Sequence, residues 1–134
     1  MEARLRQLAE SYQMPIVGEK TPVELQNPVD LTAPGFLPRP YGRVLDVLAH
    51  EPFDAYLLVW SYTPLIRVPV AELEDFRRST TKPFVLVLLA AADDAKPYLK
   101  DLSARGICAY LTPEDGATAL NALLARSRFP ALSS

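Results

Sequence analysis

The segment Phe84–Ala90 (FVLVLLA) is the feature that most constrains the fold, because it holds seven apolar residues in a row. An amphipathic helix or a half-buried strand would interrupt such a run with polar residues. A strand covered on both faces does not need them, and such strands are typical of parallel sheets. The run therefore predicts the centre of a parallel sheet, whose strands must be joined by crossover connections.

The rest of the chain alternates short apolar segments with one-sided helical patterns. The other predicted strands are Gln26–Thr32, Asp54–Trp60 and Ile107–Leu111, and the predicted helices are Glu2–Tyr12, Tyr41–Ala49, Pro69–Ser79, Asp93–Arg105 and a last one from Thr112–Pro113 to about Arg126. Four strand-then-helix units predict right-handed crossovers with helices on both faces of the sheet. The predicted fold class is α/β, a three-layer α/β/α flavodoxin-like fold with a mainly parallel sheet of four to five strands.

Two predicted helices carry end signals. Asp93 or Asp94 is available as the N-cap of one helix, and Gly106 as the residue just past its end. Thr112 precedes a proline and two acids at the start of the last helix, which favours an N-cap followed by a first turn that suits the helix dipole. Its predicted apolar face consists of Ala117, Leu120 and Leu124.

Composition excludes several classes of function. The chain has 134 residues and a net charge of -2, which offers no excess of positive charge for a nucleic-acid backbone. No apolar run approaches the ~20 residues that cross a bilayer, and the N-terminus is charged where a signal peptide would be apolar, so a cytoplasmic protein is expected. Five isolated glycines cannot form a Gly-rich phosphate loop.

Ligands in open α/β sheets bind at the carboxyl ends of the strands. Asp30 could orient a ligand there, or simply bond the backbone of the next loop. The loop Ser61–Pro64 could offer hydroxyls and helix N-H groups to a phosphate, or merely cap a helix. The strand-end candidates are Asp30, Thr32, Gly35, Ser61, Tyr62, Thr63, Asp93, Asp94, Thr112 and Glu114.

No catalytic residue and no metal ligand set is predicted. His50 is the only histidine and stands where a helix ends, so it is expected to interact with that helix end rather than act as a base. Cys108 is the only cysteine and is expected to pack as a small hydrophobe in a short strand. The adjacent Asp93 and Asp94 point in different directions, so capping explains them better than metal binding.

Two stretches of sequence resemble the NDP-forming acyl-CoA synthetases. The first is Asn27–Thr32 (NPVDLT), followed after a helix by Pro52–Val59 (PFDAYLLV). The second contains KPFVLV from Lys82, then Leu102, then GICAYLTPE from Gly106 and an Ala-Leu-rich helix. Their order and spacing resemble that family's second flavodoxin-like domain, which is similar to a domain of succinyl-CoA synthetase.

The resemblance implies a supporting role in acyl-CoA formation. In that family a phosphoryl group passes from ATP or GTP to a histidine held between two helix N-termini, and then to the acyl group. By position, the helix contributed here follows Asp54–Trp60 and is approached through Ser61–Pro64. The implied partner or phosphate-site residues are Asn27, Asp30, Ser61 and Thr63.

The family's phosphohistidine, nucleotide-binding and CoA-binding domains have no counterpart in these residues. ATP or GTP, Mg and CoA are therefore implied for the full enzyme, with no cofactor bound by this chain alone. The resemblance places residues 1–25 in an N-terminal helix and connector, 26–127 in the flavodoxin-like domain and 128–134 in a frayed tail.

The leading hypothesis is a non-catalytic domain or small subunit of such a synthetase, working with other synthetase domains or subunits. The alternative is a stand-alone interaction or regulatory module that keeps the fold without ligase chemistry and self-associates through apolar surface. A small stand-alone enzyme using Asp30 and the Ser61–Thr63 loop ranks last, because no nucleophile and base pair is identifiable.

Overall fold

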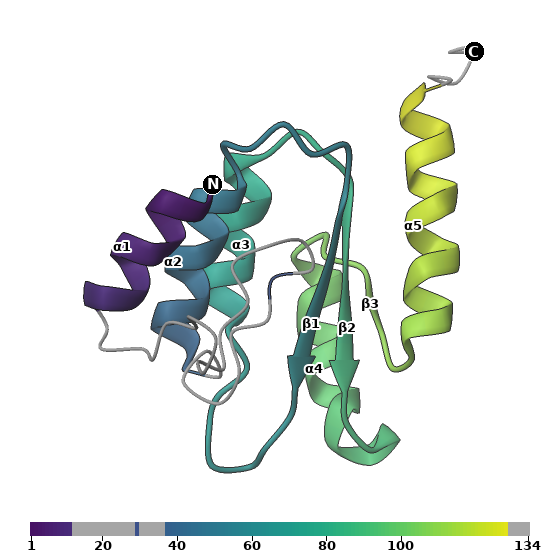
Figure 1. Cartoon of the computed structure of the whole chain (residues 1–134). Helices are drawn as coiled ribbons and strands as arrows, with labels where there is room; N and C mark the ends of the chain where they lie inside the picture. Colours follow the sequence, from purple (N-terminus) through teal and green to yellow (C-terminus); the bar gives the residue numbers. More distant parts are fainter. Residues whose placement is uncertain (12–28, 30–36, 129–134) are drawn as a thin grey trace. The chain divides into compact units, whose positions relative to one another are not determined.

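The computed structural model describes residues 1–11, 29 and 37–128 (Figure 1). They contain five helices and three strands: α1 (Glu2–Ser11), α2 (Pro38–Leu48), β1 (Tyr56–Ser61), α3 (Val70–Ser79), β2 (Phe84–Leu89), α4 (Ala92–Ala104), β3 (Ala109–Tyr110) and α5 (Pro113–Arg128). The chain divides into two compact units. The helical unit comprises Met1–Glu51 and Pro69–Thr80, and the sheet unit comprises Pro52–Val68 and Thr81–Ser134.

The sheet unit is built on three parallel strands in the order β1-β2-β3. β1 pairs with β2 along its whole length, from Tyr56 opposite Phe84 to Ser61 opposite Leu89. β3 is short and pairs with β2 only through Ala109 and Tyr110. Because β2 lies between two partners, the prediction that the apolar run 84–90 forms the sheet centre is confirmed within the described residues.

The burial of β2 follows from its position. The four residues from Val85 to Leu88 are fully buried, so neither face of the strand's central part meets solvent, whereas Leu89 at its end is exposed. In β1 the pattern alternates instead: Tyr56, Leu58 and Trp60 are buried, whereas Leu57 and Val59 are partly exposed. One face of β1 is therefore better covered than the other.

Helix α5 packs on the face of the sheet that carries Val85 and Val87. The contact is close because α5 presents Gly116, which is buried. A Cβ atom at this position would lie 2.6 Å from Cγ2 of Val87 and 3.4 Å from Cδ1 of Leu57. The residue that seats the helix on the sheet is thus Gly116, whereas Ala117 of the predicted apolar face is exposed.

The ends of α4 and α5 show which capping predictions hold. Gly106 has φ 75° and follows the C-cap Arg105, as predicted. The Asp115 N-H donates to Oγ1 of Thr112 at 3.1 Å, which confirms the predicted cap of α5. The predicted capping by Asp93 or Asp94 is wrong, because Ala91 is the N-cap of α4 and both acids lie inside its first turn.

The helical unit contains α1, α2 and α3, with α1 packed on α2 and α2 packed on α3 (Figure 1). Helix α2 begins at Pro38, three residues before the predicted start at Tyr41. Prolines are tolerated in the first turn because the N-H that they lack has no intrahelical partner there. Pro38, Pro40 and Tyr41 are buried together with Val44 and Leu45.

The α/β class and the parallel sheet are confirmed by the structure. The described sheet has three strands rather than the predicted four to five. Of the predicted strand at 26–32 the structure describes Val29 alone, so that strand is not tested. Residues 12–25, which hold the predicted connector, and the end of the predicted tail, 129–134, lie outside the described residues. Among the helices described, none is long and apolar enough to cross a membrane.

Candidate functional site

The carboxyl edge of the sheet gathers the residues that follow β1 and β2. Both strands run in the same direction and end opposite each other, at Ser61 and Leu89. The Tyr62 N-H then donates to the Leu89 carbonyl at 2.9 Å, which extends the ladder one residue beyond β1. The backbone therefore fixes where Ser61 and Tyr62 lie, at the edge where open parallel sheets bind ligands.

The loop after β1, residues 62–68, is folded by its own backbone. Thr63 and Ile66 form an antiparallel bridge, and the Ile66 N-H donates to the Thr63 carbonyl at 3.3 Å. Oγ1 of Thr63 also accepts a long hydrogen bond from the Leu65 N-H at 3.4 Å. This tight turn pushes Leu65 outward, and its side chain is 91% exposed.

The residues carried over from the family resemblance fall into two groups. Asn27 and Asp30 lie outside the described residues, as do Thr32 and Gly35. Ser61 and Thr63 are both half-buried at the carboxyl edge. Neither of them caps α3, because that helix starts at Val70 with Pro69 as its N-cap and no side-chain capping bond. Their hydroxyls are placed by the sheet edge and the loop.

Tyr62 is brought together with α4 by an aromatic contact. Its ring centroid lies 5.9 Å from that of Tyr98, and the two ring planes are tilted by 53°. Partial burial of the phenol, and then the negative charges of Asp94 and Tyr98, raise the pKa of Tyr62. Asp94 is therefore close enough to act electrostatically on the Tyr62 hydroxyl.

Tyr98 is a site residue that the sequence analysis did not nominate. It does not follow a strand, so the rule for strand ends does not find it. The available signal was its position four residues after Asp94 on a predicted helix, since side chains at that spacing share a helix face. The contact with Tyr62 depends on how α4 packs, which no local pattern specifies.

The turn before α5 holds the remaining candidates. Thr112 uses its hydroxyl to cap the helix, and its carbonyl accepts from the Gly116 N-H at 3.0 Å. Glu114 and Asp115 are exposed in the first turn, where their charge suits the helix dipole. Thr112 therefore has a structural role that leaves no side-chain group aimed at a ligand.

His50 behaves as predicted. Its Nδ1-H donates to the Asp46 carbonyl at 2.8 Å, so the ring bonds the last turn of α2.

The prediction for Cys108 is wrong, because its side chain is exposed. The physical reason is that β3 has only two residues, Ala109 and Tyr110, so Cys108 precedes the strand instead of packing within it. The thiol makes no hydrogen bond with any described residue, whereas the Cys108 carbonyl accepts from the Leu86 N-H at 2.9 Å.

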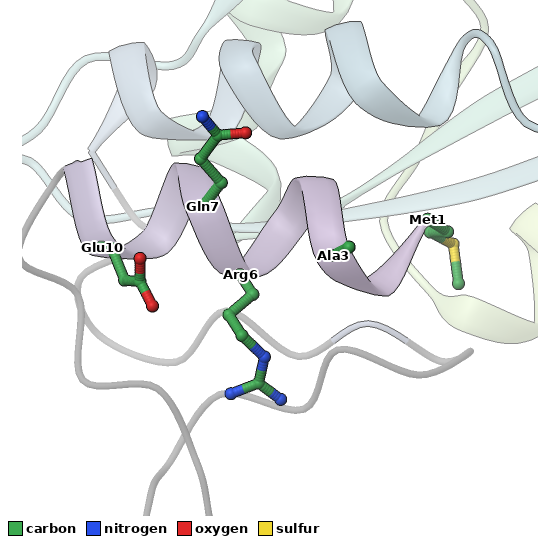
Figure 2. A pocket seen from close by; sticks show the side chains of 5 residues that line it. All are labelled: Met1, Ala3, Arg6, Gln7 and Glu10. Carbon is green, nitrogen blue, oxygen red and sulfur yellow. The ribbon is translucent and has the colours of Figure 1, made fainter.

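A cavity of about 510 Å³ lies along α1, far in the sequence from the strand ends. The residues that line it are Met1, Ala3, Arg6, Gln7 and Glu10. Figure 2 shows Gln7 pointing to the opposite side of the helix from Arg6 and Glu10. The polar groups that line the cavity do not converge on one point, so we assign no binding site to this cavity. No group of three or more potential metal ligands occurs in the part of the chain that the structure describes.

Comparison with known proteins adds no relative. No family model matches the chain, and neither a curated protein nor a solved structure matches it.

Proposed function

We propose that this chain is a non-catalytic domain or small subunit of an NDP-forming acyl-CoA synthetase, and that it completes the phosphohistidine site of a partner chain. The observation that carries the proposal is that the second stretch of sequence that resembles the family folds as one unit. Residues 82–124 supply β2, α4, β3 and most of α5, which belong to one unit around one parallel sheet. Motifs that resemble one domain in order and spacing thus also fall in a single α/β unit.

The proposed full fold is the flavodoxin-like three-layer arrangement with a sheet of four to five strands, of which residues 26–32 would supply the fourth. ATP or GTP, Mg and CoA would be bound by the partner domains, and the assembly would work in the cytoplasm. We also propose that this chain alone catalyses no reaction. This is supported by the structural roles of two candidate groups: the hydroxyl of Thr112 caps a helix, and the ring of His50 donates to a backbone carbonyl.

The loop 62–68 is the proposed contact with the partner. Leu65 is the most exposed of the large apolar residues described, and a partner surface would remove that side chain from water. Ser61 and Thr63 flank the start of the loop, and their hydroxyls would face the phosphoryl group of the partner. The Ser61 hydroxyl makes no hydrogen bond with any described residue, so it is available as a donor.

A pull-down of the tagged chain from its native cells, followed by mass spectrometry, tests this proposal. We expect a synthetase chain in near-equal amount, carrying phosphate that is lost in acid and kept in alkali, as for phosphohistidine. Leu65→Ser is expected to reduce its recovery by about fivefold, because the serine variant forgoes the burial of apolar surface that Leu65 would gain on binding. Leu37→Ser, at another exposed leucine, is the matched control and is expected to keep recovery unchanged.

The alternative function, a stand-alone module that self-associates, is favoured by one observation. Leu57 is 42% exposed and Val59 is 44% exposed on the same face of β1. Recovery of the chain with itself alone would support this alternative and count against the synthetase proposal.

A further inference from the structure

Three side chains of the sheet unit gather beside the end of β1. The rings of Tyr62 and Tyr98 are in contact at 5.9 Å between centroids. Asp94 and Tyr98 are four residues apart on α4, so they lie on one face of that helix. The raised pKa of Tyr62 agrees with this placement, because the Asp94 charge contributes to it.

These three side chains combine a negative charge with two aromatic rings. Ring faces carry partial negative charge, and two tilted rings beside a carboxylate attract a positive group. Asp94 forms no ion pair or hydrogen bond with any residue that the structure describes. The lysines of the same helix, Lys96 and Lys100, are each two residues from Tyr98, a spacing at which side chains do not face each other.

We propose that Tyr62, Tyr98 and Asp94 bind the cationic head of a small organic ammonium compound. The positive group would lie against the two ring faces, with its charge balanced by the Asp94 carboxylate. Quaternary ammonium groups suit this arrangement, because their positive charge is spread over methyl groups that pack on aromatic rings. All three residues belong to the chain's own sheet unit, so this binding does not depend on the proposed partner.

The site formed by Tyr62, Tyr98 and Asp94 is open to solvent, so the affinity that we propose for the ammonium compound is weak. Exposed cation-π contacts and exposed ion pairs each contribute little, which corresponds to a dissociation constant in the millimolar range. A site of this strength suits a compound that is abundant in the cell, or one whose other atoms make further contacts at the carboxyl edge.

Titration of the 15N-labelled protein with choline, followed by NMR, tests the proposal. We expect concentration-dependent shifts of the Tyr62 and Tyr98 amides. The uncharged analogue of choline in which carbon replaces nitrogen, 3,3-dimethylbutan-1-ol, is expected to cause no comparable shifts. Equal shifts with the two compounds would show that charge plays no part and would overturn the proposal.

Two isosteric variants provide the matched comparison. Asp94→Asn is expected to weaken choline binding by about threefold to fivefold. Asp93→Asn removes the neighbouring acid, which is exposed in the same turn but lies on a different face, and is expected to change binding by less than about 1.5-fold. An equal effect of both variants would contradict the assignment. Because no partner protein is present, failure here leaves the proposed function untouched.

Discussion

Replacing Gly116 with alanine is expected to destabilise the sheet unit by up to about 2 kcal/mol. The new Cβ would lie 2.6 Å from Cγ2 of Val87, and Val87 is fully buried, so it has no room to move. Overpacking of this kind costs about 1 to 3 kcal/mol, whereas the higher helix propensity of alanine returns at most about 1 kcal/mol. The free energy of unfolding in urea measures the difference.

The double variant Gly116→Ala with Val87→Ala isolates the clash. Val87→Ala removes both methyl groups of the side chain, including the Cγ2 that the new Cβ would meet, so the two changes are expected to couple favourably by about 1 kcal/mol or more. Ala117→Gly, at the exposed neighbouring position, measures helix propensity alone. A stabilising effect of Gly116→Ala would mean that α5 is not pressed against β2.

Above pH 10 the protein is expected to lose stability because of Tyr41. Burial raises the pKa of this phenol well above its ordinary value of 10.0. In the unfolded chain the phenol ionises near pH 10, whereas in the folded chain it stays protonated. The unfolded state is therefore favoured increasingly as the pH rises, by up to about 1.4 kcal/mol per pH unit, and the stabilising contribution is fully present below pH 10.

Urea unfolding at pH 9 and pH 11 checks this prediction. Tyr41→Phe removes the titrating group, so the drop in stability between the two pH values is expected to be smaller by about 1 kcal/mol. Tyr110→Phe, at a half-buried tyrosine, controls for the loss of one phenol. If Tyr41→Phe and the unchanged protein lose equal stability, Tyr41 ionises in the folded state.

Sequence patterns predicted the elements whose signals are local. The apolar run of β2 requires burial on both faces, and the threonine, proline and acids before α5 form a complete capping signal. Prolines carry a less specific signal, because a proline can stand before a helix, in its first turn or, with strain, inside it. Pro38 and Pro40 start α2 instead of preceding it, and Pro97 lies inside α4, where it is exposed.

The incorrect predictions share a dependence on tertiary structure. Helix α4 begins at Ala92, one residue earlier than predicted, so Asp93 and Asp94 lie within the helix instead of capping it. Strand β3 pairs with β2 at only two positions, which leaves Cys108 outside it. Tyr98 joins Tyr62 only because α4 packs beside the end of β1. Periodicity along the chain does not contain this information.

If this chain completes the active site of a partner synthetase, as we propose, the rate of acyl-CoA formation by that synthetase will depend on the presence of the chain. The synthetase chain that co-purifies would be assayed with its nucleotide, Mg and CoA, with and without an equimolar amount of this protein. We predict that adding the protein raises the rate by about tenfold or more, because a phosphohistidine held by only one of its two helix N-termini lacks part of its electrostatic stabilisation. Equal rates with and without this protein would show that it does not complete the active site of the synthetase.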